Sequence, residues 1–156
     1  MEQHLYQLQR HLPEQLHLDN LIRLGERHLR VTEVLTVPQG DLRLPVRVIE
    51  MGSQAAGAPA IGFFGGVHGV ERIGTQVILS WLHSLIHRLQ WDDQLHRRLE
   101  HIRLVFMPMV NPGGVWRRTR SNPNGVDLMR NAPVEADGKV SFLVGGQRIS
   151  RHLPWF

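Results

Sequence analysis

A histidine and a glutamate, His68 and Glu71, stand three residues apart in the segment that most suggests chemistry. They follow residues 60–64, an apolar run that predicts a buried strand, and two glycines that allow the backbone to turn sharply. Three residues span about one helical turn, so both side chains can reach one point. Together they supply two ligands of a catalytic zinc site built from two histidines and one glutamate. Alone, the pair is also typical of a solvent-exposed helix start.

Further polar motifs lie between residues 108 and 131. In order, they are Asn111-Pro-Gly-Gly, Trp116-Arg-Arg-Thr-Arg-Ser and Asn124-Gly-Val-Asp-Leu-Met-Arg-Asn131. With His68-x-x-Glu71, they closely resemble the zinc carboxypeptidases of the carboxypeptidase A type. That family has a strand ending in His-x-x-Glu, an Asn-Pro-Asp-Gly turn, an arginine segment and Gly-Val-Asp-x-Asn-Arg-Asn. The resemblance covers roughly residues 44 to 132.

The resemblance implies a zinc cofactor, Zn²⁺, with His68 and Glu71 as metal ligands. It also implies that Asp127 is the carboxylate that orients His68 from behind the metal. This agrees with a general rule, because a metal-bound histidine normally donates its other ring N–H to an acceptor. The alternative for Asp127 is a turn residue that follows Asn-Gly.

The same resemblance implies roles for arginines. Arg117 matches the catalytic arginine that stabilises the oxyanion of the tetrahedral intermediate, where a fixed guanidinium acts as charge develops. Arg118 or Arg120 takes that role if the register is shifted. Arg130 matches the arginine that binds the substrate's terminal carboxylate, which its planar fork suits. Asn111 follows the next predicted strand, so we expect it to face the same crevice and bind substrate.

Three positions depart from the family pattern. Met129 stands where the family has an Asn that helps to clamp the substrate carboxylate. Gly113 stands where many relatives have Asp, and Val70 stands where the pancreatic-type enzymes carry Arg. The change at Met129 puts ordinary exopeptidase specificity in doubt.

Two family features are expected beyond residue 156: the third zinc ligand, a later histidine, and the general-base glutamate. Within the sequence, His152 is the one late histidine, but its setting favours an exposed or core-edge side chain. Glu135 lies in a predicted loop and is not assigned as the base. We therefore expect residues 1–156 to be the N-terminal portion of a single catalytic domain, with residues 1–30 as an N-terminal helical segment.

The expected fold class is α/β, zinc carboxypeptidase-like and of the phosphorylase/hydrolase-like kind, apparently incomplete. Its central sheet is mixed and largely parallel, and helices flank both faces. Apolar spacing predicts two N-terminal helices, a hairpin of strands 31–37 and 44–51, strand 60–64, helix 71–90, a short helix to about residue 100 and strand 102–107. Residues 108–131 are predicted to be rich in loops. An incomplete sheet leaves apolar edges uncovered, so we expect a homodimer or a further part of the chain to cover them.

Composition narrows the function classes. The chain contains no cysteine, so a metal site must use His, Asp or Glu. The net charge of +4 comes from scattered arginines, with Lys139 as the one lysine, and we expect no nucleic-acid partner. No apolar run approaches the roughly 20 residues of a membrane span, so we expect no membrane partner. The N-terminal residues show no signal-peptide pattern, so the expected location is cytoplasmic.

The resemblance implies a zinc-dependent hydrolase that cleaves a peptide or amide bond next to a free carboxylate. The substrate partner is then a peptide or an N-acyl amino acid. Met129 favours a deacylase of the succinylglutamate desuccinylase/aspartoacylase type, whereas the full Asn-Gly-Val-Asp motif favours a peptidase. The third alternative is a catalytically inactive, carboxypeptidase-like binding module, which predicts weak or absent zinc.

Other histidine pairs have the spacing of metal ligands. His83 and His87 lie four residues apart, as do His96 and Glu100. Because their helices are amphipathic, these side chains are predicted to be solvated or partly buried rather than ligands. Trp116 is adjacent to Arg117. Its side chain either lines the substrate pocket or packs elsewhere.

Overall fold

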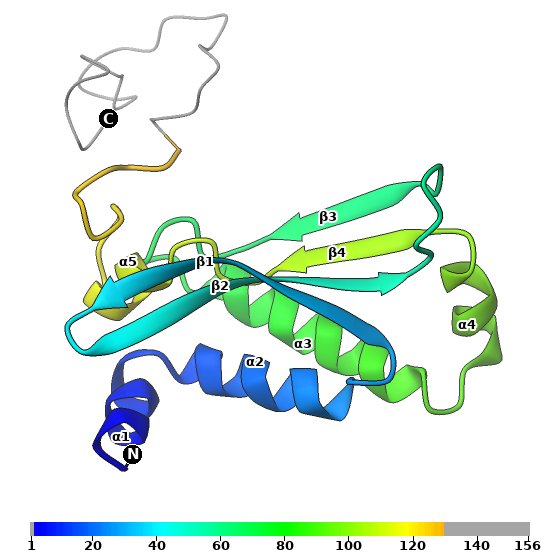
Figure 1. Ribbon diagram of the computed structural model, residues 1–156, viewed down its shortest axis with the longest axis horizontal. Coiled ribbons are helices and arrows are strands. Elements are labelled where there is room, and N and C mark those ends of the chain that lie inside the picture. The colour runs from blue at the N-terminus through cyan, green and yellow to red at the C-terminus, as the bar shows by residue number, and fades with distance from the viewer. Residues whose placement is uncertain (1, 130–156) are drawn as a thin grey trace, which may run out of the picture.

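The computed structural model describes residues 2–129 of the chain, which form a mixed sheet with helices packed on it (Figure 1). The elements in order are α1 (Glu2–His11), α2 (Pro13–Leu24), β1 (Leu29–Gln39), β2 (Leu42–Gly52), β3 (Ala60–Phe64), α3 (Ile73–Arg88), α4 (Asp93–Leu99), β4 (Arg103–Met107) and α5 (Pro112–Arg117). Within this part of the chain, no helix has the length and apolar character needed to cross a bilayer.

The sheet has the strand order β1-β2-β4-β3. β1 and β2 form the predicted antiparallel hairpin, and β2 also pairs antiparallel with β4. β3 and β4 pair in parallel, with Ala60 opposite Arg103 and Phe64 opposite Met107. The mixed α/β class is confirmed. Its parallel part consists of β3 and β4, which are the predicted strands 60–64 and 102–107. Among the described strands, parallel pairing is confined to this pair.

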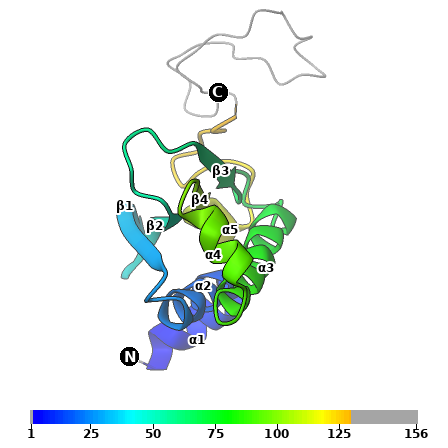
Figure 2. The same cartoon turned by 90° about the vertical axis from the view of Figure 1, so that its right-hand side faces the viewer.

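The main core lies between the sheet and the two long helices. α2 and α3 run side by side beneath the same face of the sheet (Figures 1 and 2). The core's buried side chains come from α2, β2, α3, α4 and β4; among them are Leu18, Leu21, Ile49, Met51, Leu79, Leu82, Ile86, Leu99, Leu104 and Phe106. Helices on the other face stay a prediction, because the two long described helices share one face.

An aromatic cluster fixes α3 against the two parallel strands. The Phe63 ring of β3 lies 4.3 Å from the Trp81 ring of α3 and 5.4 Å from the Phe106 ring of β4, measured between centroids. Phe106 is fully buried. Edge-to-face and offset aromatic contacts at these separations add to the area that the rings bury. The cluster therefore fixes the middle of α3 against β3 and β4.

The start of the long helix differs from the prediction by two residues. The helix predicted from Glu71 begins at Ile73, and Glu71 lies in a turn closed by its own N–H, which donates to the His68 carbonyl over 3.1 Å. The segment predicted to be rich in loops contains one short helix among its described residues, α5, in which Pro112 occupies the first turn. Proline suits the first helical position because its missing N–H would have no partner there.

The start of α4 carries an ionised aspartate with two kinds of partner. Asp92 accepts a hydrogen bond from the Leu95 N–H over 3.0 Å, as a helix N-cap, and another from Arg88 Nε over 3.0 Å. The Leu95 hydrogen bond, followed by those of Arg88, holds the pKa of Asp92 below its ordinary value of 3.8. A depressed carboxyl pKa contributes stability above the ordinary value, and this contribution is lost as pH falls through the folded value.

We therefore predict that Asp92→Asn flattens the acid side of the stability profile. Asparagine keeps a cap acceptor for Leu95 but does not titrate. The free energy of unfolding, measured by urea denaturation from pH 6 downward, should fall less steeply below about pH 4 in the variant. Asp93→Asn removes a neighbouring charge without removing the cap and is the matched control. Equal slopes for wild type and Asp92→Asn would contradict the assignment.

Candidate functional site

The candidate site lies where the two parallel strands end. The loop after β3 and the segment after β4 continue side by side: Val110 N donates to Gly65 O and Asn111 N donates to Gly66 O, each over 2.9 Å. In α/β sheets, ligands gather beyond the carboxyl ends of parallel strands. The topology thus brings the His-x-x-Glu segment and the Asn-Pro-Gly-Gly segment to one edge, as the sequence predicts.

Glycine allows the two segments to touch through their backbones. A Cβ atom added to Gly69 would lie 1.9 Å from the carbonyl carbon of Gly114. Gly66 has a φ of +61°, in the left-handed region that favours glycine. A side chain at residue 69 would push the loop that carries His68 away from α5.

Asn111 joins the same two segments through its side chain. Its Nδ2 donates to Val67 O over 3.1 Å, and its Oδ1 accepts from Gly114 N over 2.9 Å. The side chain is buried, and the second bond caps α5. Both ends of the Asn111 amide bond to the protein backbone, and the substrate-binding role of this residue stays a prediction. The structure places Asn111 as a residue that positions the His68 loop.

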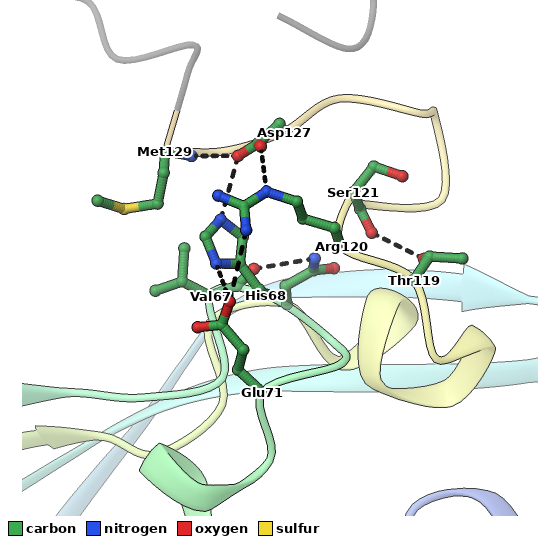
Figure 3. A network of polar contacts seen from close by, with 9 residues as sticks. Val67, His68, Glu71, Thr119, Arg120, Ser121, Asp127 and Met129 are labelled. Carbon is green, nitrogen blue, oxygen red and sulfur yellow. Dashed lines mark hydrogen bonds and ion pairs between the residues drawn. The ribbon is translucent and has the colours of Figure 1, made fainter. Parts of the chain in front are cut away.

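His68 lies between two carboxylates (Figure 3). Its Nδ1 is 3.1 Å from Glu71 Oε1, and its Nε2 is 3.2 Å from Asp127 Oδ1. His68 and Asp127 are each only 8% exposed, whereas the Glu71 side chain is 58% exposed. The predicted trio therefore meets, with the buried carboxylate behind the ring and the open one in front.

A single ring proton cannot serve both contacts of His68. A neutral imidazole has one N–H, so it can donate to only one of the two carboxylates. When Nε2 donates to Asp127, the lone pair of Nδ1 faces an oxygen of Glu71. A proton or a metal ion between these two atoms removes the repulsion.

The separation of Nδ1 and the Glu71 oxygen fits a metal. Two zinc bonds of about 2.0–2.1 Å at a tetrahedral angle place their ligand atoms about 3.3 Å apart, close to the 3.1 Å seen here. Asp127 lies at the opposite ring nitrogen, so it cannot join the same ion. Among residues 2–129, no three His, Cys, Asp or Glu side chains gather around one metal position. The described residues thus offer two ligands and leave a third to be supplied.

Arg120 connects the two carboxylates. Its Nε donates to Asp127 Oδ2 over 2.7 Å, and its Nη1 lies 3.4 Å from Glu71 Oε1. Met129 N also donates to Asp127, over 3.0 Å. Burial alone would raise the pKa of Asp127, but the hydrogen bonds from Arg120 and His68 outweigh burial and the pKa is lowered. Asp127 is therefore an anion that holds the ring of His68.

The other candidate arginines are placed elsewhere. Arg117 donates to Gln39 Oε1 over 3.0 Å and to Pro123 O over 2.9 Å, and it makes no ion pair with Glu71 or Asp127. Arg118 has a left-handed φ of 56° at the end of α5. Of the three arginines considered from the sequence, the structure brings Arg120 to the carboxylates. Arg130 lies outside the described residues.

Trp116 lies away from His68. Its indole stacks on the His11 ring with centroids 4.7 Å apart. Together with Arg117 and Arg118, it lines an open cavity of about 450 Å³. Sequence reasoning named Arg120 only as an alternative to Arg117 and did not predict its contacts with Glu71 and Asp127, because these depend on a fold that brings residues 71 and 127 together.

Residues 1–143 match the sequence profile of one family, described as zinc carboxypeptidase. Carboxypeptidase SOL1 of Arabidopsis thaliana is 28% identical over 67% of this chain and 22% of its own length. Carboxypeptidase E of Caenorhabditis elegans is 28% identical over 71% of this chain and 28% of its own length. A metallo-carboxypeptidase structure from Burkholderia cenocepacia shares the fold, with a TM-score of 0.61 and 18% identity over 74% of this chain and 31% of that one. The chain thus spans between about a fifth and a third of these proteins.

The contact between the loops yields a stability prediction. Gly69→Ala should destabilise the protein by about 1–3 kcal/mol, the usual range for overpacking, because its Cβ meets the Gly114 backbone. Urea denaturation measures the change. Gly57→Ala is the matched control, because a Cβ at residue 57 meets no atom within 4 Å. A Gly69→Ala protein as stable as the control would contradict the packing described.

Proposed function

We propose, since this chain belongs to the zinc carboxypeptidase family, that its protein is a zinc-dependent hydrolase that cleaves a peptide or amide bond next to a free carboxylate. The observation that carries the proposal is the placement of His68, with one ring nitrogen facing Glu71 and the other facing the buried Asp127. The family supports a metallocarboxypeptidase type of hydrolase, and this site supplies residues suited to that chemistry.

His68 Nδ1 and Glu71 are the proposed zinc ligands. When bound, zinc supplies Lewis-acid activation of the scissile carbonyl and of a water molecule. Asp127 accepts a hydrogen bond from the Nε2–H of His68. This bond keeps the lone pair on Nδ1 and holds the ring in place. Arg120 holds Asp127 and approaches Glu71, so it positions both sides of the site. The third ligand and the general-base glutamate are expected outside the described residues.

The arginines divide into two proposed roles. Arg120 is a positioning residue, because its described contacts are with the two carboxylates that flank His68. The oxyanion role implied for Arg117 requires it to leave Gln39 and Pro123, whereas Arg120, the alternative for that role, already lies beside Glu71. Arg130 is proposed to bind the substrate carboxylate.

A deacylase of N-acyl amino acids is the second candidate. Met129, which stands where the family pattern has a carboxylate-clamping Asn, favours it. Met129 is 58% exposed, and its backbone N–H is bonded to Asp127, so it lies at the rim of the site. A panel of dipeptides compared with N-succinyl and N-acetyl amino acids separates the two activities. A protein that binds no zinc and cleaves neither class would be a binding module.

Removing the ring or its support should weaken zinc binding to different degrees. We predict that His68→Ala abolishes tight zinc binding and hydrolysis, and that Asp127→Asn lowers zinc affinity by about 10- to 100-fold. Titration against a competing zinc chelator measures both affinities, and His101→Ala, which removes an exposed histidine elsewhere, is the control. Unchanged zinc affinity and activity in His68→Ala would show that the metal is bound at a different place.

The two arginine roles predict different kinetics. Arg117→Ala should lower kcat by about 10²- to 10³-fold with zinc affinity intact, as loss of an oxyanion donor does. Arg120→Ala should lower zinc affinity as well, because Asp127 and Glu71 lose their shared partner. Steady-state kinetics and zinc titration on both variants distinguish these outcomes. A loss of zinc affinity in Arg117→Ala but not in Arg120→Ala would reverse the assignment.

A further inference from the structure

Two histidines of α3 face each other on the protein surface. His83 and His87 lie one helical turn apart, and both are exposed. Their Nε2 atoms are 2.9 Å apart, and the two rings are nearly perpendicular, with centroids separated by 4.4 Å. His83 lies three turns beyond the start of α3, roughly 15 Å along the helix axis. The pair is therefore separate from His68, which precedes that helix.

The facing nitrogens are arranged as metal ligands are. Each neutral imidazole has one ring-nitrogen lone pair that can bind a metal, and here the two Nε2 atoms lie close together on one helix. Two bonds of about 2.0 Å at a right angle place their ligand atoms about 2.8 Å apart, whereas a tetrahedral angle requires about 3.3 Å. The separation of 2.9 Å, which also allows a hydrogen bond between the two rings, is close to that of adjacent positions around a square-planar or tetragonal ion.

The surroundings do not oppose a cation. Arg88, the next residue along α3, has its charge paired with Asp92 through Nη2 at 2.5 Å. The ring of His17, from α2, lies 6.4 Å from that of His83 between centroids and adds a third imidazole nearby. His17 does not reach the same point, in keeping with the absence of three converging ligands among residues 2–129.

We propose that His83 and His87 form a two-histidine chelate for a first-row transition-metal ion that accepts tetragonal nitrogen ligands, with Cu²⁺ bound more tightly than Ni²⁺ or Zn²⁺. Water completes the coordination. The order follows both the geometry of the pair and the general affinity order of these ions. The site is independent of the proposed hydrolase site and of its reaction.

Titration of the protein with Cu²⁺ alone tests the proposal, followed by electron paramagnetic resonance and calorimetry in a weakly competing buffer. We expect a tetragonal Cu²⁺ signal with hyperfine structure from imidazole nitrogens. His83→Ala and His87→Ala should each lower the Cu²⁺ affinity on the order of 10- to 100-fold, because the second bond of a chelate forms within one molecule. Alanine suits exposed helix positions, so both variants should fold.

Two control variants keep the test specific. His101→Ala removes an exposed histidine outside the pair and should retain the signal and the affinity. His68→Ala distinguishes binding at the pair from binding at the proposed zinc site, because its ring is not part of the chelate. Cu²⁺ binding that is unchanged in both His83→Ala and His87→Ala would overturn the proposal. A Cu²⁺ signal lost in His68→Ala but kept in His83→Ala would overturn it as well, by placing the ion at His68.

Discussion

The described part of the chain is arranged around one interaction, an imidazole held between two carboxylates. His68 has one N–H to share when neutral, and Asp127 lies behind the ring while Glu71 lies in front. Asp127 is buried and kept ionised by Arg120, so it takes the N–H. The lone pair of the other nitrogen is left beside an exposed carboxylate, and these two groups are the proposed zinc ligands.

The rest of the fold serves to hold that ring against its two partners. The parallel ends of β3 and β4 bring together loops more than forty residues apart in sequence, and Asn111 bonds the loops to each other. Gly69 allows the loop backbone to rest on Gly114. The Phe63–Trp81–Phe106 cluster fixes α3, the helix that follows Glu71.

The sequence allowed the strands, the long helix and the family to be predicted, because each depends on local periodicity or on ordered motifs. The start of α5 could also have been predicted. Asn111 followed by Pro112 is a strong helix-start signal, and it lies in the segment that was predicted only to be rich in loops. Which of the three arginines lies beside Glu71 and Asp127 could not be predicted from the sequence. Arg117, Arg118 and Arg120 are close in sequence, and their directions depend on the left-handed residue Arg118 and on distant partners such as Gln39.

The most direct test of this account is nitrogen NMR of the His68 ring. Protein labelled with ¹⁵N-histidine, carrying His83→Ala and His87→Ala so that the surface pair takes no metal, is compared before and after addition of one equivalent of zinc. The account predicts that Nδ1 of His68 shifts to a metal-bound value while Nε2 keeps its proton for Asp127. A zinc-bound Nε2, or a His68 ring whose two nitrogens do not respond to zinc, would contradict it.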